Sequence, residues 1–318
     1  MITKIGIIGG GNIGGVIVQE IVSRRLSRSI GLVDVKPPDV AKGKCLDIAE
    51  GIPVINTDIT IDGSKSYEVI RDAQIVINTA GVPRTVRADG SIPTREELLA
   101  INLQITDIVA DNILNYCPEA IVISIANPLD AIVFRLFQRL NIPKNRLIGM
   151  AGVLDSARYR YFISEAAGVS VESVNAMVLG GHGDTMVPVR SCCQIAGIPV
   201  EEFLSTDVLD RIEERVRNAG AEVVGLMGTG SAFVSPAWSA IEMIEAIVFD
   251  KKKILPCCSL LESEYGVNGY FVGVPVILGA NGIEKIIEIN LTDIERVAFD
   301  RSIEAVKKTV EDVRSITS

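Results

Sequence analysis

The chain begins with the stretch MITKIGIIGGGNIGG, residues 1–15, and this stretch decides the fold. Residues 4–8 form a short apolar run of the kind that makes a buried parallel strand. Gly9, Gly11 and Gly14 follow in the spacing G-x-G-x-x-G, and apolar residues then recur at helical spacing. Between a strand and a helix, Gly9 allows a tight turn, Gly11 leaves room for a pyrophosphate and Gly14 lets the helix pack closely. The free N–H groups of the helix N-terminus would hold the phosphates.

A second strand supports this interpretation. Residues 29–35 read SIGLVDV and place Asp34 at the end of an apolar run. An acidic side chain there accepts hydrogen bonds from ribose hydroxyls and repels a 2′-phosphate, so NAD is favoured over NADP. The alternative is a glycine-rich turn followed by an ordinary capping Asp. The predicted cofactor contacts from these two strands are Gly9, Gly10, Gly11, Asn12, Ile13, Gly14, Gly15 and Asp34.

Composition limits the class of protein. A chain of 318 residues with 48% hydrophobic content can form one large or two medium domains. The net charge of −9 argues against binding to nucleic acid or to an anionic membrane surface. Six cysteines without a C-x-x-C pair indicate reduced, buried thiols and no metal site. Without an apolar run long enough to cross a bilayer, or a basic leader, we expect a cytoplasmic protein.

The first half alternates between strands and helices. Apolar strands are expected at 58–62, 74–80, 120–126 and 146–150, with helices at 37–50 and 94–116 among them. This alternation predicts an α/β fold, a Rossmann-type doubly wound parallel sheet over residues 1–150. Ligands of such sheets lie at the carboxyl ends of the strands, where Gly9, Asp34, Gly81 and Asn127 occur.

The pattern changes after about residue 150. Helices are expected at 155–167, 207–226 and 236–249, and the runs 254–261 and 270–278 indicate a hairpin. Thr292 and Glu295 form a capping box for a terminal helix. Residues 151–318 are therefore predicted to form an α+β domain that supplies the substrate site and the catalytic groups.

His182 is the only histidine of the chain. It lies in LGGHGDTMVP, residues 179–188, and the neighbouring glycines suggest backbone room and exposure to a cleft. Since its ordinary pKa lies near neutrality, histidine is the natural proton donor and acceptor. The alternative is a core or surface histidine without a task.

A catalytic histidine needs a carboxylate on its other ring nitrogen. Asp155, in GVLDSARYR, is the candidate, although it could instead be a helix N-cap. Arg158 follows one helical turn later and suits a two-pronged grip on a carboxylate, unless it belongs to a solvated face.

The segment 82–95, VPRTVRADGSIPTR, follows a strand at its ligand-facing end. It contains Arg84, Arg87 and Arg95, together with a glycine and prolines. These features favour a mobile lid that brings cations over a closed site, and the alternative is a solvated loop.

Taken together, these motifs resemble the lactate/malate dehydrogenase superfamily, and within it the malate dehydrogenases of the lactate-dehydrogenase-like type. Nearly the whole chain takes part in the resemblance. It is carried by GIIGGGNIGG at 6–15, GVPR at 81–84, REELLAIN at 95–102, IANPLDA at 125–131, VLDSAR at 153–158, GGHGDTMVP at 180–188 and GTGSA at 228–232.

The resemblance implies a role for each matching residue. It makes His182 the proton donor and acceptor and Asp155 its orienting partner. Residues implied to contact the substrate are Arg84 on the second carboxylate, Arg95 on the carbonyl, Arg158 on the first carboxylate, and Asn127 and Ser231 in the pocket. Residues implied to contact NAD beyond the glycine loop are Asn102, Ile125, Ala126 and Asn127.

The implied reaction is the reversible oxidation of (S)-malate to oxaloacetate with NAD, in a homodimer or homotetramer of the tricarboxylic acid cycle. The helical runs 17–22 and 207–226 are expected to bury apolar faces against the second copy. One departure from the family is the longer segment between Arg84 and Arg95, eleven positions apart, in which Arg87 could replace Arg84. The alternatives are an L-lactate or other 2-hydroxyacid dehydrogenase and a non-catalytic dinucleotide-binding regulator.

Overall fold

The computed structural model describes residues 2–82, 94–228 and 230–317, and a nine-stranded sheet forms its centre. The strands lie in the order β14-β13-β12-β6-β5-β4-β1-β2-β3. The six strands of the first half are parallel and are β1 (Lys4–Ile8), β2 (Ser29–Val33), β3 (Thr60–Ser64), β4 (Ile75–Asn78), β5 (Ile121–Ser124) and β6 (Leu147–Gly149). The predicted Rossmann-type sheet is confirmed, with the strand bounds shifted by one or two residues.

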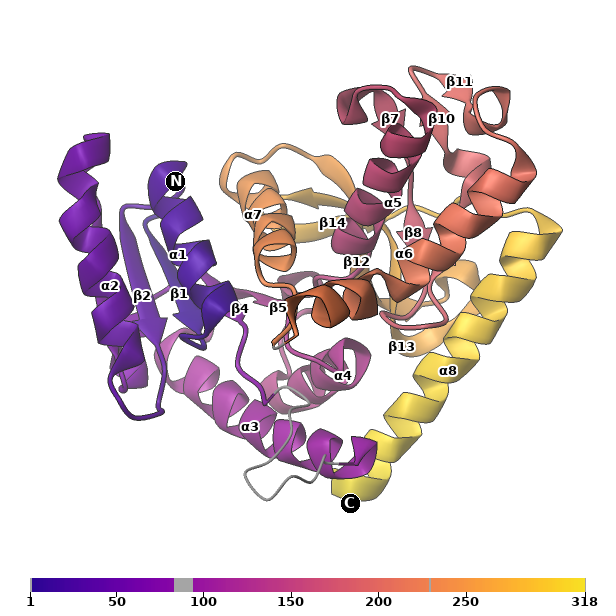
Figure 1. The fold of residues 1–318 in the computed structure, drawn as a ribbon. Coiled ribbons are helices and arrows are strands. Elements are labelled where there is room, and N and C mark those ends of the chain that lie inside the picture. Colours follow the sequence, from indigo (N-terminus) through magenta and orange to yellow (C-terminus); the bar gives the residue numbers. More distant parts are fainter. Residues whose placement is uncertain (1, 83–93, 229, 318) are drawn as a thin grey trace.

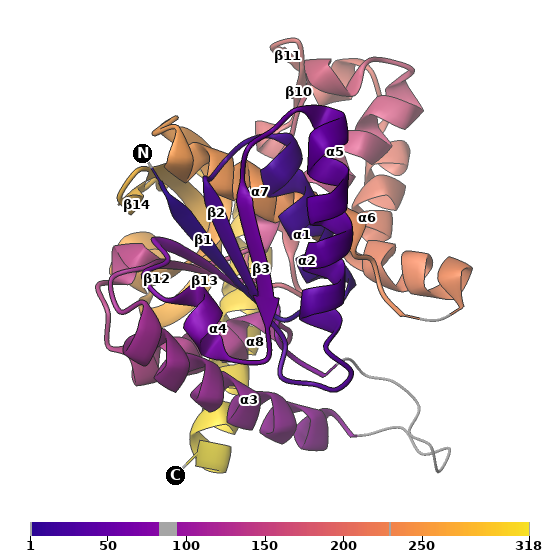
Figure 2. The ribbon, with the colours of Figure 1, turned by 90° about the vertical axis from the view of Figure 1, so that its left-hand side faces the viewer.

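Helices cover both faces of this sheet because its side chains alternate between them. Ile5 and Ile7 of β1 face α1 (Asn12–Ser23) and α2 (Val40–Gly51), whereas Ile8 faces α3 (Arg95–Tyr116) and α4 (Leu129–Leu140). Figures 1 and 2 show α1 and α2 on one side of the strands and α3 and α4 on the other. Both faces are buried, so the strands read as apolar runs rather than alternating ones.

The second half extends the same sheet. The antiparallel hairpin of β12 (Lys253–Glu262) and β13 (Asn268–Gly279) joins β6 through the pair Cys258 and Gly149, and β14 (Gly282–Ile286) forms the edge. The expected hairpin is confirmed, and hydrogen bonding continues across residue 150 within one sheet. A smaller three-stranded sheet combines β7 (Val174–Asn175), β10 (Gln194–Ile195) and β11 (Ile198–Pro199).

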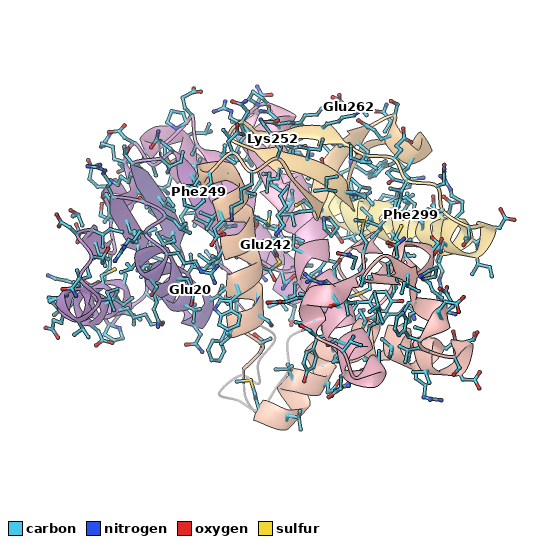
Figure 3. All side chains as sticks on the ribbon, turned by 90° about the horizontal axis from the view of Figure 1, so that it is seen from above. Glu20, Glu242, Phe249, Lys252, Glu262 and Phe299 are labelled. Atoms are coloured by element: carbon cyan, nitrogen blue, oxygen red, sulfur yellow. The ribbon has the colours of Figure 1, made fainter. Side chains whose placement is uncertain are left out.

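Four helices complete the second half: α5 (Gly152–Ala167), α6 (Thr206–Met227), α7 (Val234–Val248) and α8 (Asp293–Thr317). Figure 3 shows α7, which carries Glu242, between the N-terminal layers and the other helices of this half. Arg24, the C-cap residue of α1, donates to Glu245 of α7 at 2.8 Å, so α7 joins the two halves. The capping box of Thr292 and Glu295 starts α8 as expected.

Several local expectations were wrong. The helix expected from residue 155 begins at Gly152, so Asp155 lies inside its first turn and is not an N-cap. Ile17 and Ile21 of α1 are fully buried inside the chain, so these two side chains are not available to a second copy. Cys192 is only half-buried, while the other five cysteines are buried, and all six are free thiols. Among the described residues, no helix is long and apolar enough to cross a membrane.

Candidate active site

The glycine loop forms a cradle at the carboxyl end of β1. Gly9 has φ +106°, a conformation that favours glycine, and an alanine Cβ built at Gly14 would lie 2.0 Å from the Gly9 carbonyl oxygen. A Cβ at Gly11 would meet no atom of the described residues within 4 Å, so this part of the chain leaves the space above Gly11 open. The N-cap of α1 is Gly11, which has no side chain to cap the helix. Free amides beside an open, Cβ-free surface fit the pyrophosphate of a dinucleotide.

Asp34 lies beside this cradle at the end of β2. Its Oδ2 accepts the Gly10 N–H at 2.9 Å and its Oδ1 accepts the Lys36 N–H at 3.0 Å. The carboxylate is therefore held at the loop with lone pairs left for ribose hydroxyls.

Lys44 is part of the same cradle, which the sequence reasoning missed. From α2 its Nζ donates to the Gly11 carbonyl at 2.7 Å, and burial lowers its pKa while the charge of Asp34 opposes that effect. The weak helical pattern of residues 37–50 offered no signal that separates Lys44 from Lys42.

Asn102 of α3 joins the ends of two strands. Its Oδ1 accepts the Val82 N–H at 2.7 Å, and its Nδ2 donates to the carbonyls of Val82 and Asn127 at 3.2 and 3.1 Å. These bonds hold the segment after β4 against the segment after β5. Ile125 and Ala126 are almost fully buried there, whereas Asn127 is exposed beyond the carboxyl end of β5.

His182, Asp155 and Arg158 come together as predicted. His182 Nδ1 lies 2.9 Å from Asp155 Oδ2, and Arg158 Nη1 lies 3.3 Å from Asp155 Oδ1. The His182 side chain is 16% exposed and that of Asp155 only 2%. An ionised carboxylate only accepts, so Nδ1 carries the proton and Nε2 is left for a ligand. Burial lowers the pKa of His182, but the charge and hydrogen bond of Asp155, with Asp130 adding, raise it overall.

The position of His182 depends on close packing as well as on the backbone freedom of a glycine, since Gly180 has φ +90°. His182 lies between β8 (Val178–Leu179) and β9 (Val187–Pro188), and Gly180 exchanges two backbone hydrogen bonds with Gly273 of β13. A Cβ at Gly181 would lie 2.7 Å from Val306 of α8. Of the three glycines beside His182, Gly183 alone is exposed and has no described atom within 4 Å of a built Cβ, so the glycines serve packing on one side of His182 and openness on the other.

Asp130 is a second carboxylate at His182 that the sequence reasoning did not single out. Its Oδ2 accepts the His182 backbone N–H at 3.1 Å, and its Oδ1 accepts from Cys258 Sγ at 3.6 Å. Asp130 follows Asn127 by three residues, so this contact places His182 at the carboxyl end of β5. The available signal was an acidic residue just beyond a strand end, within IANPLDA.

Two of the remaining predicted substrate residues, Arg95 and Ser231, lie in the described part of the chain. Arg95 is the first residue of α3 and is exposed, and Ser231 is exposed before α7. Arg84 and Arg87 lie outside the described residues, as does most of the segment expected to form a lid. In the described part of the chain, no group of three or more His, Cys, Asp or Glu side chains could hold a metal ion.

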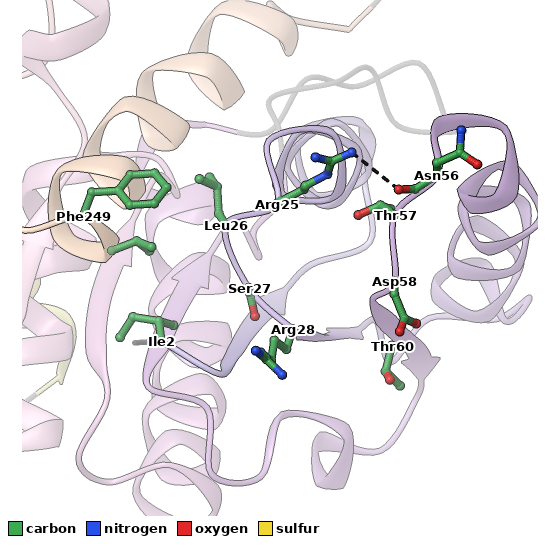
Figure 4. A pocket seen from close by; sticks show the side chains of 11 residues that line it. Ile2, Arg25, Leu26, Ser27, Arg28, Asn56, Thr57, Asp58, Thr60 and Phe249 are labelled. Carbon is green, nitrogen blue, oxygen red and sulfur yellow. Dashed lines mark hydrogen bonds between the residues drawn. The ribbon is translucent and has the colours of Figure 1, made fainter.

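A separate hollow of about 730 Å³ opens at the opposite, amino end of β1, β2 and β3 (Figure 4). Its wall includes Arg25, Arg28, Asp58 and Phe249. None of the predicted site residues lines it, so this hollow is not the candidate active site.

A Rossmann sheet with a glycine cradle and a partly buried His–Asp–Arg cluster at the carboxyl ends of its strands defines the class of nicotinamide-dependent dehydrogenases. Residues 3–149 match the model of the lactate/malate dehydrogenase NAD binding domain, and residues 152–317 match the lactate/malate dehydrogenase alpha/beta C-terminal domain. The chain belongs to the lactate/malate dehydrogenase family, and it is therefore an NAD-dependent oxidoreductase.

Known proteins similar to this chain include both branches of the family. Malate dehydrogenase 1 of Anaeromyxobacter dehalogenans is 48% identical, over 98% of each chain. The crystal structure of Cryptosporidium parvum malate dehydrogenase has a TM-score of 0.93 at 40% identity, covering 99% of this chain and 100% of that one. The lactate dehydrogenase of Cryptosporidium parvum, solved with lactic acid and NAD, has a TM-score of 0.93 at 37% identity, covering 99% and 98%.

Proposed function

We propose that the chain is a malate dehydrogenase, which oxidises (S)-malate to oxaloacetate and catalyses the reverse reduction. The observation that carries this proposal is the buried His182–Asp155 pair, joined by Arg158, on the sheet edge that bears the glycine cradle. Curated relatives named malate dehydrogenase, at 44–48% identity over nearly the full length, support malate over lactate as the substrate.

When bound, NAD would supply the hydride chemistry, as NAD⁺ for the oxidation of malate and as NADH for the reduction of oxaloacetate. The glycine cradle would hold the pyrophosphate and Asp34 the adenosine ribose. Asn102 would contribute to NAD binding mainly by holding together the segments after β4 and β5, since both the oxygen and the nitrogen of its amide are bonded to backbone groups. Ile125, Ala126 and Asn127 are proposed to lie beside the nicotinamide half.

His182 would move the proton of the substrate hydroxyl. In oxidation, neutral His182 accepts that proton at Nε2 while Asp155 holds the Nδ1–H and stabilises the imidazolium that forms. In reduction, the imidazolium donates the proton from Nε2 to the carbonyl oxygen of oxaloacetate. General acid–base help of this kind contributes about 10²–10⁴-fold in rate.

Arginines would hold the two carboxylates and the carbonyl of the substrate. Arg158 uses Nη1 on Asp155, so the rest of its guanidinium fork remains for the carboxylate next to the reacting carbon. Arg95 is proposed to polarise the carbonyl and Arg84 to bind the distal carboxylate. Ser231 is proposed to line the same pocket.

We also propose that residues 1–150 bind NAD, that residues 151–318 supply the catalytic groups, and that the chain works as a homodimer or homotetramer in the cytoplasm. Exposed apolar side chains support association of copies. Leu226 of α6 is 82% exposed and Trp238 of α7 is 53% exposed. Covering such side chains with a second copy would remove apolar surface from water.

The test is a panel of 2-oxo acids assayed with NADH and with NADPH, followed at the nicotinamide absorbance band. We expect oxaloacetate with NADH to give the highest kcat/KM. Faster reduction of pyruvate would assign the chain to the lactate branch. Binding of NADH without turnover of any 2-oxo acid would favour the non-catalytic regulator and would overturn the proposal.

A further inference from the structure

The inference concerns the second carboxylate at His182. Asp130 lies in the first turn of α4 and joins three elements, because it accepts from the His182 backbone between β8 and β9 and from Cys258 of β12. The packing there is tight, since a Cβ at Gly181 would lie 3.1 Å from Asp130 Oδ2. The peptide that carries the histidine is thus anchored on one side by Asp130, while its ring is held on the other by Asp155.

The charges around this pair decide what Asp130 can do. Titratable groups that face His182 are Asp155 and Arg158 from α5 and Asp130 from α4, and Cys258 faces Asp130 from β12. Arg158 pairs with Asp155, whereas no lysine or arginine in the described part of the chain forms an ion pair with Asp130. Within the described residues, protonated His182 is therefore the group that can act as the counter-ion of Asp130.

Burial is costly for a carboxylate without a basic partner. Burial is the main cause that raises the pKa of Asp130, and the charge and backbone N–H of His182 oppose it. The N-terminus of α4 adds a favourable partial charge. A hydrogen bond to the His182 peptide alone would need only a neutral acceptor, such as the oxygen of Asn, so Asp130 brings a charge to His182 that this hydrogen bond does not require.

We propose that Asp130 is a positioning residue of the reaction, which fixes the His182 peptide and adds the second negative charge that stabilises the imidazolium. This inference rests on the proposed role of His182 as proton donor and acceptor. It assigns the two acids different tasks: Asp155 orients the ring, and Asp130 sets the backbone and biases the proton equilibrium toward the form that reduces oxaloacetate.

The test uses Asp130→Asn, which keeps an acceptor oxygen for the His182 N–H and removes the charge. Since His182 is the only histidine of the chain, its C2–H signal in a tag-free protein can be titrated by NMR without assignment. We expect the pKa of His182 to fall in Asp130→Asn, because one of the two negative charges beside the imidazolium is lost. The alkaline limb of oxaloacetate reduction and the acid limb of malate oxidation should then both move to lower pH, while the NADH Kd changes less than about twofold.

Two further variants separate charge from structure. Asp130→Glu should restore the limbs toward the wild-type pH, and Cys258→Ala, which removes a neutral partner of Asp130, should cost stability without moving them.

Unchanged histidine titration in Asp130→Asn would overturn the proposal, as would equal losses of activity in both directions with unmoved limbs. If Asp130→Asn and Asp130→Ser both fail to fold, Asp130 serves the fold and the proposal is again overturned. Failure of the wild-type protein to reduce oxaloacetate would instead refute the proposed function, because the NMR titration does not depend on turnover.

Discussion

The substitution Gly14→Ala tests the packing of the glycine cradle. The new Cβ would lie 2.0 Å from the Gly9 carbonyl oxygen, and real Cβ atoms essentially never come closer than 3.0 Å to such an atom. The loop or α1 must therefore move by roughly 1 Å, and forced overpacking of this kind costs about 1–3 kcal/mol. Movement of the Gly9 peptide spoils the pyrophosphate site, and movement of α1 disturbs the buried Ile17 and Ile21.

We expect the cost to be divided between NADH affinity and the free energy of unfolding. If the loop takes all of it, the NADH Kd rises about 5- to 150-fold, since 1.4 kcal/mol corresponds to a factor of ten. Fluorescence titration measures the Kd, and urea denaturation measures the stability. Gly43→Ala is the matched control, because a Cβ at that position of α2 meets nothing within 4 Å. If Gly14→Ala matched Gly43→Ala in both measurements, the close approach of strand and helix would be refuted.

Three other predictions concern the catalytic groups. Asp155→Asn should lower kcat by about 10²–10⁴-fold and leave the NADH Kd nearly unchanged, because the ring loses its orienting charge; loss of NADH binding with intact kcat in stopped-flow and titration experiments would contradict this. Since the pKa of His182 is raised above 6.5, oxaloacetate reduction should persist above that pH and decline as the pH rises through the raised pKa, whereas malate oxidation should decline as the pH falls through it. If the pH profiles of kcat/KM showed the same limb in both directions, His182 would be excluded as the proton carrier. Arg84→Gln should lower kcat/KM for oxaloacetate about 10- to 150-fold, the value of a charge-assisted hydrogen bond of roughly 1.5–3 kcal/mol, and spare pyruvate; equal losses on both substrates in the NADH assay would assign the distal carboxylate to another residue.

The first half of the fold follows from local rules that the sequence displays. Buried parallel strands read as apolar runs, and a glycine with φ +106° at Gly9 is required where the strand turns into the helix. Asp155 and Arg158 share a helix face because residues three positions apart are neighbours on an α-helix, so their proximity is also a local property. Such features depend on neighbours within a few positions, and periodicity predicts them well.

The association of the two halves follows from long-range pairing. Nothing in the run 254–261 indicates that its strand would join the Rossmann sheet at Gly149 rather than form a separate sheet. The packing of the glycines beside His182 could not be predicted either, because their partners, Gly273 and Val306, are more than ninety positions away. Single-sequence periodicity reports which face of an element is apolar and contains no information about which distant face it meets.

The amino-acid sequence by itself determined the cradle and the pair of groups on α5, since each depends on backbone sterics or helical spacing. Only the tertiary structure decided that Asp130 meets His182 and Cys258, residues 52 and 128 positions further along the chain. The physical reason is that burial sets how strongly a charge interacts with its neighbours. Burial in turn comes from elements distant in the sequence that pack around the charged group.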